Sequence, residues 1–72
     1  MMKILREVNF NDELRLSLSH ISPNDLYFVS VDVVYCERFI VNIFKQDFND
    51  KDNALACYSL RHELIEKLYT KS

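Results

Sequence analysis

Apolar and polar side chains alternate most clearly between residues 26 and 44, where the chain reads LYFVSVDVVYCERFIVNIF. In the first half of this stretch every second residue is aromatic or β-branched, and the same period resumes after the polar residues 36–38. Period-two alternation of such residues is typical of strands, and a short polar break between two of them is typical of a hairpin. The pattern therefore predicts two antiparallel strands joined by a turn at residues 36–38.

A third strand is predicted at residues 13–21, where leucines at alternate positions are separated by arginine and serine. A helix is the alternative, because Asn11 could cap it and its apolar residues could share one face. Nearby serines weaken the helix by competing for backbone hydrogen bonds, so we favour the strand. Residues 22–25, which read SPND, then form the turn into the hairpin.

Residues 1–9 are predicted to form a short helix, because four apolar residues recur at helical spacing: Met1, Ile4, Leu5 and Val8. A strand is the alternative, since some of these positions also alternate with polar residues, although Arg6 interrupts that alternation. The polar cluster at residues 9–12 would end either element.

A longer helix is predicted from about Lys51 to Tyr69, after a polar connection in which Asn49 or Asp50 can cap its first turn. Its expected buried stripe contains Ala54, Cys57, Tyr58, Leu64, Ile65 and Leu68. Arg61 falls near the middle of this stripe. Its methylene groups could pack on the sheet while the guanidinium reaches solvent, or it could form an ion pair at an interface.

Together these elements predict one domain of the α+β class that spans residues 1–72. The expected architecture has two layers, a three-stranded antiparallel sheet and a long C-terminal helix packed on one face of that sheet. The expected order of elements is αβββα. The alternative order is βαββα, in which the hairpin and the last helix stay unchanged.

The alternation also assigns side chains to the two faces of the sheet. One face is predicted to pack on the last helix through Leu14, Leu16, Leu18, Val29, Val31, Val33, Val41 and Ile43. The opposite face mixes polar residues with large apolar ones, so either the N-terminal segment covers it or it binds a partner. In the second case, and with Arg61 of the helix included, the predicted partner-binding residues are Arg15, Phe28, Asp32, Val34, Ile40, Asn42, Phe44 and Arg61.

Composition narrows the classes of partner. Eleven acidic and nine basic residues give a net charge of −2, so no basic excess is present to neutralise a nucleic-acid backbone. The chain has no glycine, which excludes glycine-based phosphate loops. No apolar run approaches the roughly 18 residues of a membrane span, and no signal-peptide pattern is recognisable. With two cysteines in such a chain, we expect reduced thiols and a cytoplasmic location.

Neither catalysis nor cofactor binding is predicted. Cys57 falls on the apolar stripe of the last helix and is expected to be inert, and Cys36 lies in the hairpin turn with only Arg38 as a basic neighbour. The two cysteines and two histidines lack the paired short spacing of a zinc site. The acidic residues at 47–52 lack the glycine and the terminal glutamate of a calcium loop, so helix capping explains them better.

The expected order of a helix, three antiparallel strands and a long C-terminal helix resembles that of double-stranded RNA-binding domains along the whole chain. That family carries a lysine-rich cluster at the start of its second helix, where this chain has KDNAL at residues 51–55. The family's glycine-containing loop between the first two strands corresponds to SPND at residues 22–25. Because both RNA-contacting elements differ here, the resemblance implies a shared topology whose function has moved to protein binding.

The predicted function is therefore a small non-catalytic protein–protein interaction module that binds a protein partner or forms a homodimer. Size and composition add the hypothesis of an accessory or inhibitor protein of phage or mobile-element type. The alternative function is that of a weak nucleic-acid-binding domain. No cofactor or metal is expected in either case.

Overall fold

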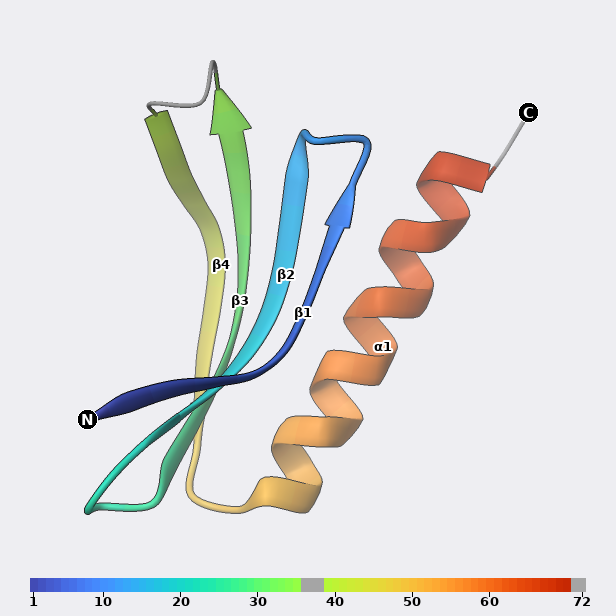
Figure 1. Cartoon of the computed structure of the whole chain (residues 1–72). Coiled ribbons are helices and arrows are strands. Elements are labelled where there is room, and N and C mark those ends of the chain that lie inside the picture. Colours follow the sequence, from blue (N-terminus) through green and yellow to red (C-terminus); the bar gives the residue numbers. More distant parts are fainter. Residues whose placement is uncertain (36–38, 71–72) are drawn as a thin grey trace.

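The computed structural model describes residues 1–35 and 39–70, which form four strands and one helix (Figure 1). The elements are β1 (Met2–Phe10), β2 (Leu14–Ile21), β3 (Leu26–Tyr35), β4 (Phe39–Phe48) and α1 (Lys51–Thr70). Each strand pairs antiparallel with the next, so β1 and β4 form the two edges of the sheet. The predicted α+β class, with an antiparallel sheet and a C-terminal helix, is confirmed. The turn predicted at residues 36–38, with Cys36, lies outside the described residues.

The predicted three-stranded sheet and both predicted element orders are wrong, because residues 2–10 form an edge strand instead of a helix. β1 pairs with β2 along its length, so the backbone of β1 finds hydrogen-bond partners in β2. The side chains of Val8 and Phe10 also pack against the core. The apolar residues that suggest a helix, such as Met1 and Ile4, are largely exposed. The observed order ββββα also differs from that of double-stranded RNA-binding domains, which begin with a helix.

A tight turn at Asn11 and Asp12 makes the β1–β2 hairpin possible. These two residues have φ angles of 52° and 58°, and the Glu13 N–H donates to the Phe10 carbonyl oxygen at 2.9 Å. Positive φ at both central positions is the type I′ arrangement, whose twist matches that of paired strands. Asparagine and aspartate tolerate this conformation better than other residues, so the turn forms in a chain without glycine.

The strand predicted at residues 13–21 is confirmed, and its leucines lie at the centre of the core. In the β2–β3 ladder, Leu16 lies opposite Val31 and Leu18 lies opposite Val29. All four side chains are buried beneath α1. Among the described residues, the buried apolar core consists of Leu16, Leu18, Val29, Val31, Ala54 and Ile65.

One irregularity in β4 changes the faces of its side chains. Val31 pairs with Phe44 and Asp32 pairs with Asn42, so Ile43 is an extra residue in β4. Such a bulge disrupts the alternation of side chains between the two faces. As a result Phe44 lies on the α1 side and packs against the core, whereas strict alternation predicts it on the opposite face.

The helix crosses the sheet obliquely, from the end of β4 toward the β1–β2 turn (Figure 1). Near its C-terminal end the Tyr69 hydroxyl donates to Glu13 Oε2 at 3.1 Å, and the Tyr69 ring stacks on Phe10 with centroids 5.8 Å apart. Desolvation and the hydrogen bond to Glu13 both raise the pKa of Tyr69. Because α1 leans toward β1, the Phe39 end of β4 stays uncovered and Phe39 is 67% exposed.

This oblique crossing also shifts the buried stripe of the helix. Ile65 is buried as predicted, and Tyr58 is half-buried against the core. Leu64 and Leu68, by contrast, belong to the predicted stripe but are 46% and 73% exposed. The helix therefore turns part of its apolar side away from the sheet, on the side nearest β4.

Asp50 caps the first turn of α1, because its Oδ1 accepts the Asp52 N–H at 3.1 Å. Asp50→Ala is therefore expected to lower the free energy of unfolding by about 0.5–2 kcal/mol. The urea midpoint followed by circular dichroism measures this loss. Asp47→Ala is the control, because it removes a carboxylate from β4 that caps no helix. Equal midpoints for the two variants would show that the cap does not stabilise the fold.

Candidate protein-binding surfaces

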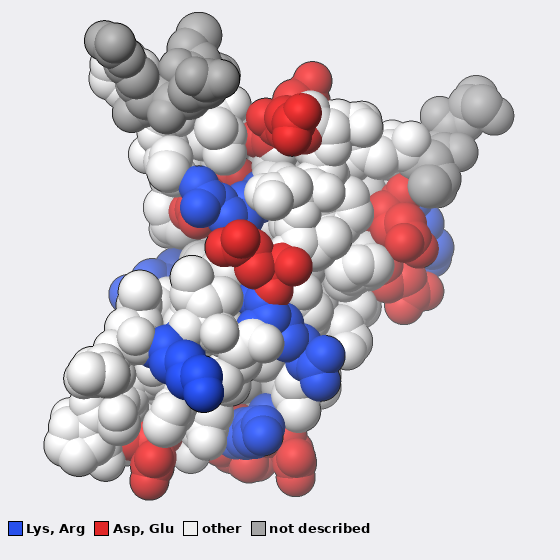
Figure 2. Space-filling model, viewed as in Figure 1, with Lys and Arg blue, Asp and Glu red and all other residues white. Residues whose placement is uncertain are grey.

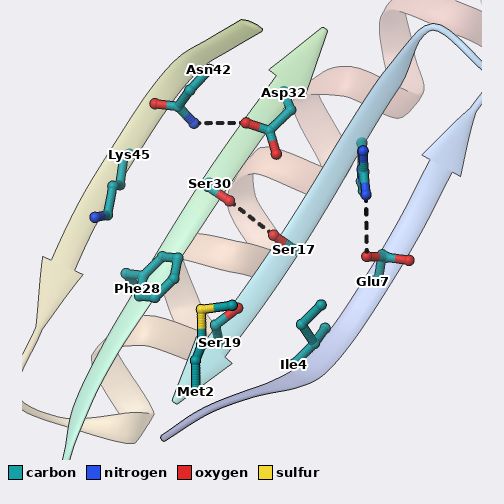
Figure 3. A pocket seen from close by; sticks show the side chains of 11 residues that line it. Met2, Ile4, Glu7, Ser17, Ser19, Phe28, Ser30, Asp32, Asn42 and Lys45 are labelled. Atoms are coloured by element: carbon teal, nitrogen blue, oxygen red, sulfur yellow. Dashed lines mark hydrogen bonds and ion pairs between the residues drawn. The ribbon is translucent and has the colours of Figure 1, made fainter. Parts of the chain in front are cut away.

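The sheet face opposite α1, here called the open face, forms a shallow pocket of about 290 Å³ (Figure 3). Its floor consists of three buried serines of β2 and β3, Ser17, Ser19 and Ser30. Larger side chains from all four strands surround this floor: Met2, Ile4, Glu7, Arg15, Phe28, Asp32, Asn42 and Lys45. The N-terminal segment thus joins the rim as a strand and does not cover the face as a helix.

Polar groups of the open face interact mainly with their neighbours. Arg15 Nη1 lies 4.0 Å from Glu7 Oε2, and Asn42 Nδ2 donates to Asp32 Oδ1 at 2.8 Å (Figure 3). Arg15 Nε is buried and makes no hydrogen bond to the described residues. The pocket is lined by two acidic residues, Glu7 and Asp32, and two basic ones, Arg15 and Lys45, so it has no dominant sign of charge.

Six of the predicted partner-binding residues lie on this open face. Arg15, Phe28, Asp32 and Asn42 line the pocket, while Val34 and Ile40 pair across β3 and β4 nearer the hairpin end. Phe28 is less available than predicted, because Lys45 Nζ lies 4.7 Å from the centre of its ring. The open face is also less apolar than predicted, since Phe44 is absent from it.

The other two predicted residues, Phe44 and Arg61, meet on the α1 side of the sheet. The guanidinium carbon of Arg61 lies 3.9 Å from the centre of the Phe44 ring, which is a cation–π contact. Arg61 can therefore lie on an apolar stripe, since its charged group stacks on an aromatic ring. Both residues line an apolar groove of about 310 Å³, together with Leu14, Val31, Ile43, Leu64, Ile65 and Leu68.

Exposed apolar side chains extend this groove along β4 and α1. We call them the β4–α1 surface, which consists of Phe39, Val41, Ile43, Leu64 and Leu68. Their exposed fractions range from 46% to 73%. The sequence pattern predicts that Val41, Ile43 and Leu64 meet across the helix–sheet interface. They stay exposed because α1 leans away from this end of β4 (Figure 1).

Titratable groups elsewhere make contacts typical of structural residues. His20 Nε2 lies 3.0 Å from Asp25 Oδ1, and Cys57 is half-buried against the core. Burial raises the pKa of Tyr58. Within residues 1–35 and 39–70, no three His, Cys, Asp or Glu side chains lie close enough together to hold a metal ion.

No protein-family model matches this chain, and no curated protein or solved structure is significantly similar to it. In the part of the chain that the structure describes, no helix has the length and apolar character needed to span a membrane. The open face and the β4–α1 surface are therefore the features from which a function can be inferred.

Proposed function

We propose that this protein is a non-catalytic protein–protein interaction module that binds its partner through the β4–α1 surface. The observation that supports this most directly is the exposure of five large apolar side chains on β4 and α1, of which Ile43, Leu64 and Leu68 line one groove. Single exposed apolar residues are normal, whereas a contiguous patch of them is typical of an interaction site. The groove gives a partner a place to insert an apolar side chain, as the core of a protein interface requires.

Surface charge favours a protein over a nucleic acid as the partner. Acidic and basic side chains are interspersed on the face shown in Figure 2, and the net charge is −2. At the start of α1, Lys51 lies between Asp50 and Asp52, whose negative charges would repel a phosphate backbone. Binding to nucleic acid relies on a basic stripe or patch. A nucleic-acid-binding domain is therefore the less well supported function.

The proposal also changes the expected partner-binding residues. Ile40 keeps that role although its side chain lies on the open face, because it is 54% exposed on the edge strand β4 between Phe39 and Val41 of the β4–α1 surface. Arg61 and Phe44 also keep that role, because both line the groove, where the Arg61 guanidinium stacks on the Phe44 ring. Arg15 and Asp32 lie on the opposite face of the sheet, so a partner on the β4–α1 surface does not contact them.

Ile43→Asp tests this proposal, because it places a charge on the β4–α1 surface at an exposed bulge residue. Gln46→Asp is the matched control, since it adds the same charge to an exposed position of the same strand outside this surface. Wild type and both variants are immobilised in turn, and proteins retained from an extract of expressing cells are quantified by mass spectrometry. We expect wild type and Gln46→Asp to retain a partner that Ile43→Asp loses by about tenfold or more, equivalent to roughly 1.4 kcal/mol of binding energy.

Folding must stay intact for this comparison. Ile43 is exposed, so we expect the free energies of unfolding of both variants, measured with urea, to lie within about 0.5 kcal/mol of that of wild type. Retention of the same proteins in the same amounts by all three baits would contradict the proposal. Loss of the partner by Gln46→Asp alone would likewise contradict it, because that result would place the binding site elsewhere on β4.

A further inference from the structure

The two edges of the sheet differ in how they are protected from pairing with another chain. β1 carries Lys3, Arg6 and Glu7, and its ladder is irregular between Ile4 and Arg6. In β4, residues 39–44 read FIVNIF and carry no charge, and the bulge lies only at the end of this segment. Charges and bulges normally prevent an edge strand from pairing with another molecule. The first half of β4 lacks the charges and exposes its apolar side chains.

We propose that this first half of β4 pairs antiparallel with the same segment of a second copy of the chain, about a two-fold axis at Val41. This inference rests on the proposed function, because it identifies the occupant of the β4–α1 surface. A two-fold contact brings the same segment of both chains together, so one uncharged segment is complementary to itself. Backbone N–H and C=O groups on the outer side of an edge strand such as β4 do not take part in its ladder, and they supply the hydrogen bonds.

Compatible side chains face one another in this register. Val41 meets the partner's Val41, and Phe39 lies opposite the partner's Ile43 on the α1 side of the joined sheet. On the open face, Ile40 lies opposite the partner's Asn42. No like charges are opposed, and aromatic–β-branched pairs of this kind stabilise neighbouring strands.

The same register supplies a side chain for the groove. Ile43 lines the groove with Leu64 and Leu68. Residues directly opposite in an antiparallel pair have Cβ atoms about 4.5–5.5 Å apart, so Phe39 of the partner subunit reaches the mouth of the groove beside Ile43. The two-fold axis repeats this contact in the other copy. Each subunit therefore covers part of the surface that its partner's helix leaves exposed.

The apolar area available is close to what a stable dimer needs. The β4–α1 surface and Ile40 together expose on the order of 600–700 Å² per copy, judged from their exposed fractions, and a stable interface buries about 800 Å² per partner. The edge backbone of β4 adds to this area.

A two-fold pair centred on Gln46 is the competing register for the same strand. It would place Lys45 opposite the partner's Asp47, which is a favourable charge pair. It would also leave residues 39–42 unpaired and most of the β4–α1 surface exposed. Burial of the apolar segment therefore favours the axis at Val41.

Cysteine cross-linking separates the two registers. In a background with Cys36→Ser and Cys57→Ala, Val41→Cys places a thiol opposite its symmetry mate, at a separation that a disulfide can bridge. The control Gln46→Cys lies on the same strand, but its symmetry mates are roughly 30 Å apart in the proposed register. Under mild oxidation at equal concentration, we expect about tenfold more cross-linked dimer from Val41→Cys on a non-reducing gel. More cross-linking from Gln46→Cys, or none from either variant, would overturn the proposed pairing.

Sedimentation of the unmodified chain provides an independent test. From micromolar to hundreds of micromolar protein, we expect wild type and Gln46→Asp to dimerise and Ile43→Asp to dimerise about tenfold more weakly or worse. A wild type that stays monomeric throughout would overturn the dimer. The proposed function would survive that result if Ile43→Asp still lost a different protein in the retention experiment. If wild type stayed monomeric and Ile43→Asp lost no protein in the retention experiment, both the dimer and the proposed function would be contradicted.

Discussion

Leu18→Ala is expected to lower the free energy of unfolding by about 2–5 kcal/mol, the usual loss when a buried leucine is truncated and the cavity only partly closes. Leu18 has no exposed surface and lies opposite Val29 in the middle of the sheet, beneath α1. Because small domains are stable by only about 5–15 kcal/mol, this single change removes a large part of the total. Urea unfolding followed by circular dichroism measures the loss.

Leu60→Ala is the matched control for this experiment. It makes the same chemical change, but Leu60 is 55% exposed on α1 and lies outside both the core and the groove. Alanine is at least as good a helix former as leucine, so we expect a change within about 0.5 kcal/mol. Equal losses for the two variants would show that Leu18 does not pack in the core.

The two central strands could be predicted from the sequence because their ladder is regular. β2 and β3 pair without a bulge, so period two holds along both of them. The four residues that alternation places at the centre of the core, Leu16, Leu18, Val29 and Val31, are buried there. A cap at Asn49 or Asp50 was also predictable, because short polar side chains just before a helix accept hydrogen bonds from its first free amides, and the structure shows Asp50 in this role.

The prediction fails at β1 for two physical reasons. An edge strand needs fewer apolar residues, and only Val8 and Phe10 of β1 pack against the core, so alternation along it is weak. In the sequence, the polar residues of the turn that follows also look like a loop that ends an element, and not like a hairpin turn. Asn11 and Asp12 between two β-rich segments were the signal that could have identified the hairpin, since both residues adopt positive φ more easily than most.

The β4–α1 surface depends on two features that periodicity does not encode. The bulge at Ile43 moves Phe44 to the α1 side, so strict alternation assigns it to the wrong face. The oblique crossing of α1 leaves Leu64 and Leu68 partly exposed along the groove beside β4, although their spacing is that of a buried stripe. Bulges and crossing angles result from packing among several elements, and a single strand or helix does not specify them.

The open face holds a buried polar contact that alternation does not reveal. Ser17 and Ser30 lie opposite one another in the β2–β3 ladder, and their hydroxyl oxygens are 2.8 Å apart. Period two places both serines on the face away from α1, where solvent exposure would be expected. They are instead only 7% and 6% exposed, because larger side chains surround the floor of the pocket. A hydroxyl buried in this way is stable only while it keeps a hydrogen-bond partner.

Ser17→Ala is therefore expected to lower the free energy of unfolding by about 1–3 kcal/mol, because it leaves the buried Ser30 hydroxyl without its partner. Ser30→Ala should have a similar effect for the reciprocal reason. In the double variant both hydroxyls are gone, so the combined loss should be smaller than the sum of the two single losses by about 0.5–3 kcal/mol. Urea unfolding of the four proteins measures this difference, and Ser59→Ala on the exposed side of α1 should match wild type. Strictly additive losses would show that the two hydroxyls contribute independently, and that the contact between them does not stabilise the sheet.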